Sequence, residues 1–176
     1  MALVAYNFRE AELGDLPMLR RWQDRPHVKE WWGDGAPFEE VELDDARVSR
    51  WIVELNGRPL GYMQDYSVHG WPDHHFQHLP SGARGIDQYI GDPAMIGRGH
   101  GTAFIWQRMQ ALFAAGVPVI ATDPHPENRM AIAAYEKLGF RQIGPSLASA
   151  WGTILPMEAR SPQGFVPRMK VRSNRK

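Results

Sequence analysis

The glycine-rich segment at residues 96–101 combines residue types and a spacing that could bind a phosphate. It reads Ile-Gly-Arg-Gly-His-Gly and lies between a predicted strand and a predicted helix. Glycine lets backbone N–H groups approach a phosphate closely, and the start of the following helix adds N–H donors and a partial positive charge. Together these features indicate a diphosphate site, to which Arg98 can add a charged contact.

Two common nucleotide-binding motifs do not match this loop. A Walker A loop ends in Gly-Lys-Ser/Thr, whereas no lysine stands before Thr102. A Rossmann fingerprint spaces its glycines as Gly-x-Gly-x-x-Gly, but here they run Gly-x-Gly-x-Gly with no first βαβ unit before them. A plain turn remains the alternative for the loop taken alone.

Asp87 and Asp123 are carboxylates at positions that require a partner or a reaction. Asp87 lies in the otherwise apolar predicted strand 84–90, and Asp123 follows the short buried strand predicted at 117–121. A buried carboxylate is costly unless it is paired, and ligands of α/β sheets gather at the carboxyl ends of strands. The two side chains could therefore meet in one cleft and bind a cation. The alternatives are an aspartate that caps a loop at the strand end and a turn aspartate before Pro124.

Three aromatic side chains accompany these carboxylates. Tyr135 lies on the apolar stripe of the helix predicted at 128–138, which directs it toward the sheet. A core tyrosine with a satisfied hydroxyl is the alternative to a catalytic role. Trp31 and Trp32, in a segment expected to be an aromatic, glycine-bearing loop, could cover a sugar ring. Adjacent tryptophans also divide commonly between core and surface.

The charges are unevenly distributed, although the totals of twenty basic and twenty acidic residues balance. Residues 160–176 contain six lysines and arginines and no acid, so fourteen basic residues face twenty acidic ones in the rest of the chain. An acidic body favours cationic ligands, while each single charge can also be an ordinary solvated surface group. Asp65 and Asp73 are further candidates for an acidic cleft.

The composition excludes several function classes. The chain has no cysteine, which rules out disulfides, a thiol nucleophile and thiolate-bound zinc. The spacing of the histidines between residues 67 and 84 matches no zinc motif, so we expect no metal and a flexible loop there. No apolar run is long enough to span a bilayer, and the first twenty residues show no signal-peptide pattern. We therefore expect a cytoplasmic protein without a membrane partner.

The elements that must position these residues follow from the hydrophobic pattern. The predicted strands are 4–9, 51–55 and 60–63 around the Asn56-Gly57 turn, 84–90, 117–121, 140–143 and 151–157. The predicted helices are 13–24, a short one within 38–50, 102–115 and 128–138. This order predicts a mixed α/β sheet with covering helices in one domain, residues 1–160, followed by a basic and mobile tail, residues 161–176.

Two segments together resemble the GNAT superfamily of N-acetyltransferases. Residues 96–101 are similar to its acyl-CoA loop, Gln/Arg-x-x-Gly-x-Gly/Ala, with Ile96 departing at the first position. Residues 128–140 are similar to its second signature, Asn-x-x-Ala-x-x-x-Tyr-Glu-Lys-x-Gly-Phe. The resemblance extends to aminoglycoside 6'-N-acetyltransferases over roughly residues 5–158 and is lowest between residues 68 and 83. Siderophore-type acetyltransferases share several of these segments. The segments that carry the resemblance are 30–33, 55–62, 84–88, 97–102, 122–124 and 135–137.

The resemblance implies a GNAT fold in which two parallel strands, 85–90 and 117–121, splay apart to admit acetyl-CoA. Backbone N–H groups near Tyr89 and Ile90 would face the thioester carbonyl. Tyr135 would be the general acid beside the sulfur, and Asp87 would orient the amine or relay its proton through water. The implied cofactor-binding residues are Tyr89, Ile90, Ile96, Gly97, Arg98, Gly99, His100, Gly101, Thr102, Asn128 and Lys137. The expected substrate-binding residues are Trp31, Trp32, Asp65, Asp73, Asp87 and Asp123.

The function expected from the resemblance is acetyl transfer from acetyl-CoA to a primary amine of a small cationic substrate. An aminoglycoside 6'-amine is the leading candidate, with antibiotic resistance as the corresponding role. The amine would attack directly in a ternary complex of a monomer or homodimer. One alternative is acetylation of a siderophore precursor or another metabolite amine. Another is a non-catalytic acyl-CoA or nucleic-acid-binding module that uses the basic tail; the acidic body argues against nucleic acid.

Overall fold

A mixed β-sheet forms the centre of the molecule, which a computed structural model describes over residues 4–33, 37–161 and 170–171. Within those residues the sheet has seven strands in the order β1-β2-β3-β4-β5-β9-β6. The strands are β1 (Asn7–Glu10), β2 (Val48–Leu55), β3 (Arg58–Ser67), β4 (Arg84–Ile90), β5 (Val119–Thr122), β6 (Arg141–Gln142) and β9 (Met157–Arg160). A separate hairpin consists of β7 (Leu147–Ser149) and β8 (Gly152–Ile154).

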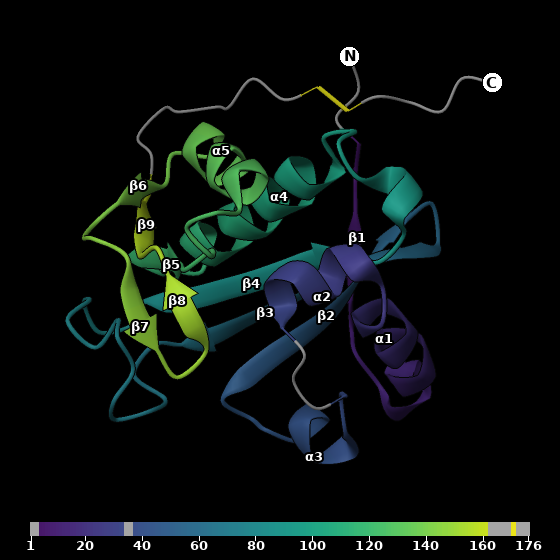
Figure 1. The fold of residues 1–176 in the computed structure, drawn as a ribbon, viewed down its shortest axis with the longest axis horizontal. Coiled ribbons are helices and arrows are strands. Elements are labelled where there is room, and N and C mark those ends of the chain that lie inside the picture. The colour runs from purple at the N-terminus through teal and green to yellow at the C-terminus, as the bar shows by residue number, and fades with distance from the viewer. Residues whose placement is uncertain (1–3, 34–36, 162–169, 172–176) are drawn as a thin grey trace.

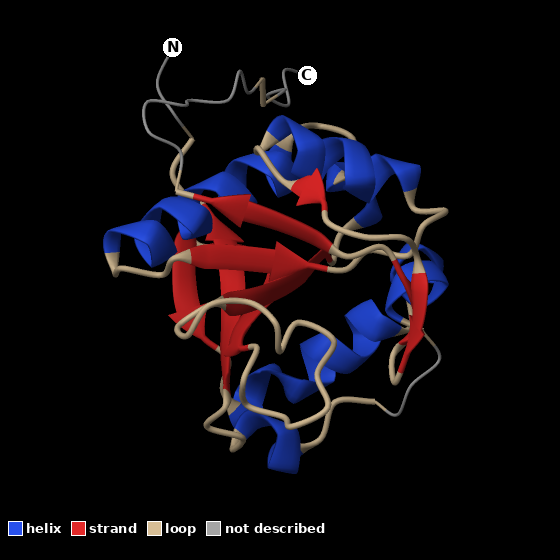
Figure 2. Ribbon diagram, turned by 90° about the vertical axis from the view of Figure 1, so that its left-hand side faces the viewer, coloured by secondary structure: helices blue, strands red, loops and turns tan. Residues whose placement is uncertain are grey.

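Helices cover both faces of this sheet (Figures 1 and 2). One face carries α1 (Leu16–Gln23) and α2 (Pro26–Trp32), with the short α3 (Glu40–Leu43) beyond them. The other face carries α4 (His100–Ala114) and α5 (Arg129–Lys137). Two short 3₁₀ turns, Leu13–Asp15 and Pro93–Met95, precede α1 and the glycine-rich loop. The arrangement confirms the predicted mixed sheet flanked by helices.

Strands β4 and β5 run parallel but stay together only briefly. Their register includes two pairs, Arg84 with Ile120 and Gly85 with Ala121. After these pairs Thr122 Oγ1 donates a hydrogen bond to the carbonyl of Ile86 at 3.2 Å. The second half of β4 therefore has β3 on one edge and, among the described residues, no strand on the other. This is the splay that the sequence resemblance implied.

Alternation along β3 and β4 decides which side chains share a face of the sheet. Gln64 lies opposite Asp87 in the antiparallel register, and this pair faces α1 and α2. Met63 lies opposite Gln88, and this pair faces α4 and α5. Because strand side chains alternate with a period of two, Asp65 shares the face of Met63 and not that of Gln64. Neighbouring residues of β3 and β4 therefore face different helical layers of the protein.

Three apolar clusters hold the layers together. The largest lies between the sheet and the α4–α5 layer and includes Phe104, Met109 and Ile120, all fully buried. A second cluster lies under α1 and α2 around Leu19 and Tyr62. The third packs residues of β3 and β5 against the irregular segment 68–83. Together they fix the sheet between its helices and the long segment.

The segment 68–83 is irregular, as expected. Several of its side chains are buried against strands β3 and β5. Val68 and Phe76 are fully buried, and Leu79 and His74 are nearly so. Burying one phenylalanine of this kind contributes about 2 kcal/mol. The histidine-rich composition concealed the apolar residues that anchor the segment to the sheet.

Most predicted elements are present with shifted ends. The strand at 84–90 and the Asn56-Gly57 hairpin are confirmed, and the first strand begins at Asn7 instead of residue 4. The helix within 38–50 is a single turn, α3, before β2 begins at Val48. Near the end of the chain, the strand predicted at 151–157 is divided into β8 and the start of β9. Pro156, which lacks an N–H donor, separates the two.

Helix α2 was not predicted: residues 31–35 were expected to form an aromatic, glycine-bearing loop, and residues 26–30 were assigned to no element. Pro26 occupies the first turn, where a missing N–H costs nothing, and Gly33 ends the helix with a φ of 89°. Trp31 and Trp32 therefore lie on the last turn of a helix. The loop prediction was wrong because it gave weight to Gly33 and overlooked the start signal at Pro26.

The tail predicted at 161–176 lies mostly outside the described residues, so its mobility remains a prediction. Of its basic residues only Lys170 is described, together with Val171 beside it. Among the described residues, every helix is too short or too polar to cross a bilayer.

Candidate active site

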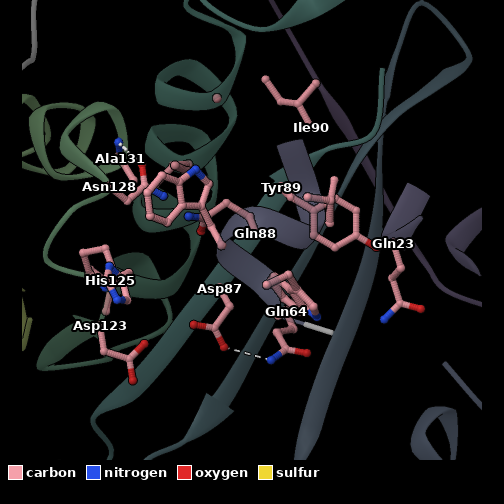
Figure 3. Close-up of a pocket in the computed structure, with 18 of the residues that line it drawn as sticks. Gln23, Gln64, Asp87, Gln88, Tyr89, Ile90, Asp123, His125, Asn128 and Ala131 are labelled. Atoms are coloured by element: carbon pink, nitrogen blue, oxygen red, sulfur yellow. Dashed lines mark hydrogen bonds between the residues drawn. The ribbon is translucent and has the colours of Figure 1, made fainter. Parts of the chain in front are cut away.

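A cleft of about 1830 Å³ follows the splayed edges of β4 and β5. Its walls come from α2, β3, β4, the glycine-rich loop, α5 and the β7–β8 hairpin. Pockets for one small ligand usually hold 300–1,000 Å³, so this cleft has room for two. Figure 3 shows part of it, with Asp87 between Asp123 and Gln64.

The glycine-rich loop forms one end of the cleft and needs its glycines. Gly97 and Gly99 have φ angles of 72° and 88°, in the left-handed region that side chains disfavour. Gly99 is the N-cap of α4, so the free N–H groups of the first helical turn follow it directly. Arg98 and Lys137 line the same end of the cleft. Backbone donors, a helix start and two cations make this end suitable for a diphosphate.

Gly99 has a second reason to be glycine. A Cβ atom there would lie 2.3 Å from the backbone oxygen of Lys170, which is closer than any real contact. Lys170 lines the cleft, and Val171 packs against the main apolar cluster. The chain therefore passes back over the glycine-rich loop at these two residues and brings a third cation to this end.

The splay exposes backbone groups in the middle of the cleft. The carbonyl of Ile86 faces β5, since it accepts from Thr122. Residues of a strand alternate in the edge to which their backbone groups point, so those of Gln88 and Ile90 face the same open side. His27 Nε2 lies 2.8 Å from the carbonyl of Ile90, which fits this direction. The N–H of Gln88 and the N–H of Ile90 are thus the donors available to a carbonyl in the splay.

Tyr135 on α5 reaches the splay from the other layer. Its side chain is 5% exposed, and Gln88 Nε2 donates a hydrogen bond to its hydroxyl oxygen. Burial raises the pKa of the Tyr135 hydroxyl well above its usual value of 10. The hydroxyl is therefore protonated at neutral pH. Gln88 and Thr122 both form side-chain hydrogen bonds with this hydroxyl and hold it at the splay.

Asp87 lies on β4 on the opposite face from Gln88. Gln64 Nε2 donates a hydrogen bond to Asp87 Oδ2 at 2.8 Å, and the Tyr62 hydroxyl donates one to Gln64 Oε1. These two hydrogen bonds fix the orientation of the Asp87 carboxylate. Burial and the nearby charge of Asp123 raise the pKa of Asp87 to about 7, against the smaller opposing effect of the Gln64 hydrogen bond. Asp87 can therefore exchange a proton near neutral pH.

Asp123 follows β5 and points into the same part of the cleft (Figure 3). His75 Nε2, from the segment 68–83, lies 2.8 Å from Asp123 Oδ2. The charge of Asp123 acts on Asp87, as the raised pKa of Asp87 shows. The two carboxylates are therefore brought together as the sequence predicted, with a histidine that it did not predict.

The two tryptophans of α2 divide between surface and core. The ring of Trp31 lies 5.7 Å from the ring of His125 at the rim of the cleft. The ring of Trp32 packs edge-on against Tyr89 at 4.9 Å and belongs to the cluster under α1 and α2. Both line the cleft, but Trp31 offers the exposed face, with 36% of its surface accessible.

Comparison with known proteins agrees with this geometry. The sequence matches the profile of the acetyltransferase (GNAT) domain over residues 12–146. The chain belongs to the GNAT acetyltransferase family. As a member it is an enzyme that transfers an acetyl group from acetyl-CoA to an amine.

Named GNAT relatives share most of the chain. An aminoglycoside N(6')-acetyltransferase type 1 from Klebsiella pneumoniae is 37% identical over 145 residues, which cover 74% of this chain and 71% of the relative. The solved aminoglycoside acetyltransferase AAC(6')-Ib in complex with coenzyme A and kanamycin has a TM-score of 0.79 at 32% identity, over 89% of this chain and 95% of that one. The same enzyme with ribostamycin and coenzyme A also has a TM-score of 0.79 at 32% identity, over 89% and 93%.

Three residues expected in the GNAT site lie elsewhere. His100 is 4% exposed and does not line the cleft, because its Nδ1 pairs with the Tyr6 hydroxyl at 2.8 Å. Burial, and then the charge of Arg98, lower the pKa of His100, so it is a neutral anchor for the start of α4. Asp73 is exposed on the segment 68–83 and is also absent from the cleft lining.

Asp65 is the third, and its true role is structural. It is 1% exposed, and Arg84 and Arg108 pair with its two oxygens at 2.7 Å each. Trp51 Nε1 also donates to it at 2.8 Å. The cluster ties β2, β3, β4 and α4 together on the face of the sheet opposite Asp87. The prediction was wrong because composition does not reveal on which side of a strand a carboxylate lies.

The remaining cofactor candidates all line the cleft. Asn128 is also the N-cap of α5, since its Oδ1 accepts from the N–H of Ala131 at 3.1 Å. The candidates in the lining are Tyr89, Ile90, Ile96, Gly97, Arg98, Gly99, Gly101, Thr102, Asn128 and Lys137.

Besides His75, sequence reasoning missed Gln64, Gln88, His74 and Trp151. Gln64 and Gln88 hold Asp87 and Tyr135, and both were hidden inside apolar strands. His74 and Trp151 line the cleft from the segment 68–83 and the β7–β8 hairpin. The Gln64–Asp87 pairing follows from strand register, but no local pattern predicts the other contacts. Among the described residues, no three histidines or carboxylates converge as a metal site.

Proposed function

We propose that this chain transfers the acetyl group of acetyl-CoA to the 6'-amine of an aminoglycoside by direct attack in a ternary complex. The observation that carries the proposal is that Asp87, Asp123 and Tyr135 line one cleft, beside the unpaired edge of β4. The named relatives, which are aminoglycoside 6'-N-acetyltransferases, support the choice of substrate. They also support a role in antibiotic resistance.

The cation-rich end of the cleft would hold the cofactor. Backbone N–H groups from Gly97 to Thr102 would bind the diphosphate, with Arg98 and Lys137 as charged contacts. The N–H groups of Gln88 and Ile90 would bind the thioester oxygen and stabilise the oxyanion that forms there. These donors are fixed in β4 and need no rearrangement when the charge develops.

The carboxylate-rich end would hold the amine. Asp87 and Asp123 attract a polyamine sugar, and Trp31 offers an aromatic face at the rim. For an ordinary aspartate, removal of a proton from an alkyl ammonium with a pKa near 10 costs about 8 kcal/mol. With a pKa of about 7, Asp87 lowers that cost to about 4 kcal/mol. Asp87 would therefore accept the proton, directly or through water.

Tyr135 would complete the reaction as the proton donor. The amine nitrogen bonds to the carbonyl carbon, the carbon–sulfur bond breaks, and the departing thiolate needs a proton. The raised pKa keeps the Tyr135 hydroxyl protonated, and its hydrogen bonds with Gln88 and Thr122 hold it at the splay. No covalent enzyme intermediate is required.

The test is release of free CoA from acetyl-CoA in the presence of kanamycin, followed with a thiol reagent. The matched control is an aminoglycoside with a hydroxyl in place of the 6'-amine, from which we expect no release. Equal turnover with both compounds would exclude the 6' position. Turnover with siderophore-type amines and none with kanamycin would favour the other metabolite class.

Two properties of the chain remain proposals beside this one. We expect a cytoplasmic location, where the cosubstrate is available, and a monomer or homodimer in solution. Cell fractionation and sedimentation would test these two expectations.

A further inference from the structure

The contact between His75 and Asp123 joins two parts of the chain that are far apart in sequence. His75 Nε2 lies 2.8 Å from Asp123 Oδ2, and the two side chains are 10% and 15% exposed. His75 belongs to the segment 68–83, whereas Asp123 follows β5. Because the segment is packed against the third apolar cluster, this approach is fixed by the fold and is not a surface encounter.

The imidazole of His75 is held from several sides. The ring of His74 stacks on it at 4.4 Å, and the ring of Phe76 lies at 4.3 Å. Trp151 from the β7–β8 hairpin meets it edge-on at 5.8 Å. The ring therefore has little freedom, and its Nε2 stays directed at the end of β5.

Nε2 of His75 has no other acceptor within the described residues. The atom is buried and makes no aligned hydrogen bond, which is costly for a polar group unless a partner is near. Asp123 Oδ2, at 2.8 Å, is the acceptor within reach. An Nε2–H donor would then occupy one carboxylate oxygen of Asp123 and leave the other for a ligand.

The neighbouring histidine, His74, does not donate a hydrogen bond to Asp123. His74 is 4% exposed, and its Nδ1 accepts from the backbone N–H of Phe76 at 3.2 Å. Burial, and then the charge of His75, lower the pKa of His74 to about 4, so His74 is neutral at physiological pH. His75 is therefore the histidine of the pair whose Nε2 is directed at Asp123.

We propose that His75 is a positioning residue for the amine: it fixes the orientation of the Asp123 carboxylate through a hydrogen bond from Nε2. This inference rests on the proposed function, because it assigns Asp123 to the ammonium group of the substrate. Removal of His75 would leave Asp123 free to turn and would increase its repulsion of Asp87. The titratable groups that face the pair are His69, His74, Tyr66, Asp87 and Tyr135.

Two substitutions separate the hydrogen bond from the packing. His75→Phe keeps a ring against His74 and Phe76 but removes the N–H donor. His75→Gln places an amide N–H near the position of Nε2 but removes the ring. We expect His75→Phe to raise KM for kanamycin about tenfold and to leave KM for acetyl-CoA unchanged. His75→Gln should restore KM for kanamycin to within about threefold of the original protein.

The pH profile gives a second reading. Without its partner Asp123 repels Asp87 more strongly, so the pKa of Asp87 rises and the midpoint of kcat/KM moves to higher pH in His75→Phe. An unchanged KM for kanamycin together with an unchanged midpoint would overturn the proposal and leave His75 as a packing residue. A double-mutant cycle with Asp123→Asn decides the same question, since additive effects of the two changes would also contradict it.

A measurement without turnover keeps this proposal separate from the proposed function. The ¹⁵N resonances of the His75 imidazole show which ring nitrogen carries the proton. We expect the proton on Nε2 in the original protein and a larger share of the Nδ1 tautomer in Asp123→Asn, whether or not kanamycin is acetylated. An identical tautomer in both proteins would overturn the role of His75, whereas absence of CoA release with a changed tautomer would overturn only the substrate.

Discussion

The cofactor end of the cleft is made from one continuous stretch, residues 84–138, with Lys170 as a single addition, whereas the amine end also needs α2, β3, the segment 68–83 and the β7–β8 hairpin. The first end presents backbone N–H groups and cations such as Arg98. The second presents side-chain carboxylates, Asp87 and Asp123, each held by a side chain from a distant segment. A local motif thus suffices for the part that binds a common nucleotide, while the part that selects the amine depends on tertiary packing.

The largest effect is expected from Asp87→Asn, which should separate the two ends most clearly. Loss of the proton acceptor should lower kcat about 100-fold to 1,000-fold, while the dissociation constant for acetyl-CoA stays within twofold. Steady-state kinetics and calorimetry measure the two quantities. The control is Asp73→Asn, an exposed aspartate of the segment 68–83, which should leave both unchanged. A comparable loss of kcat in both variants would show that Asp87 has no specific role in catalysis.

Tyr135→Phe should have the next largest effect. Removal of the hydroxyl takes away the proton for the thiolate, so kcat should fall about 10-fold to 100-fold. Acetyl-CoA affinity should hold, because the ring still packs against Phe140. Single-turnover kinetics would show whether the chemical step is slowed. A normal rate for that step would remove Tyr135 from the reaction.

Gly97→Ala tests the cofactor end alone. Gly97 has a φ of 72° with open space around the position of a Cβ, so an alanine there would be strained by its backbone conformation. We expect acetyl-CoA to bind about tenfold more weakly and KM for kanamycin to stay unchanged. Gly116→Ala is the matched control, since Gly116 has a φ of 88° and equally open surroundings after α4. A similar loss of affinity in the control would point to general destabilisation.

The pH dependence of kcat/KM tests the coupling of the two carboxylates. The pKa of Asp87 is about 7, so activity that requires the ionised carboxylate should rise with pH through about that value. Asp123→Asn removes a negative charge that raises this pKa, and the midpoint should therefore move to lower pH. A midpoint that stays in place would show that the two groups do not interact.

The smallest effect concerns stability at the amine end. A carboxylate whose pKa is raised on folding binds its proton more tightly in the folded state, so its contribution to stability falls as pH rises from about 4 to about 7. Asp87→Asn should therefore stabilise the fold at pH 8 by about 1–2 kcal/mol and have little effect at pH 4. Thermal unfolding at both values checks this. Equal shifts at both values would contradict it.

The sequence predicted the cofactor end of the cleft better than the amine end. The glycine-rich loop, the α5 signature and the strand at 84–90 were predicted because local backbone preferences define them. Asp65 was misplaced because a strand residue can face either layer, and the paired strand decides which. His75 could not be found at all, since its approach to Asp123 depends on how the segment 68–83 packs.

The passage of the chain over Gly99 has a practical consequence. Lys170 and Val171 lie against the loop where the diphosphate is expected, and Gly99 is small enough to admit them. A bulky label attached to Lys170 would therefore lie beside the cosubstrate and crowd it. Comparison of acetyl-CoA affinity before and after labelling at this position would show how far these two residues influence nucleotide binding.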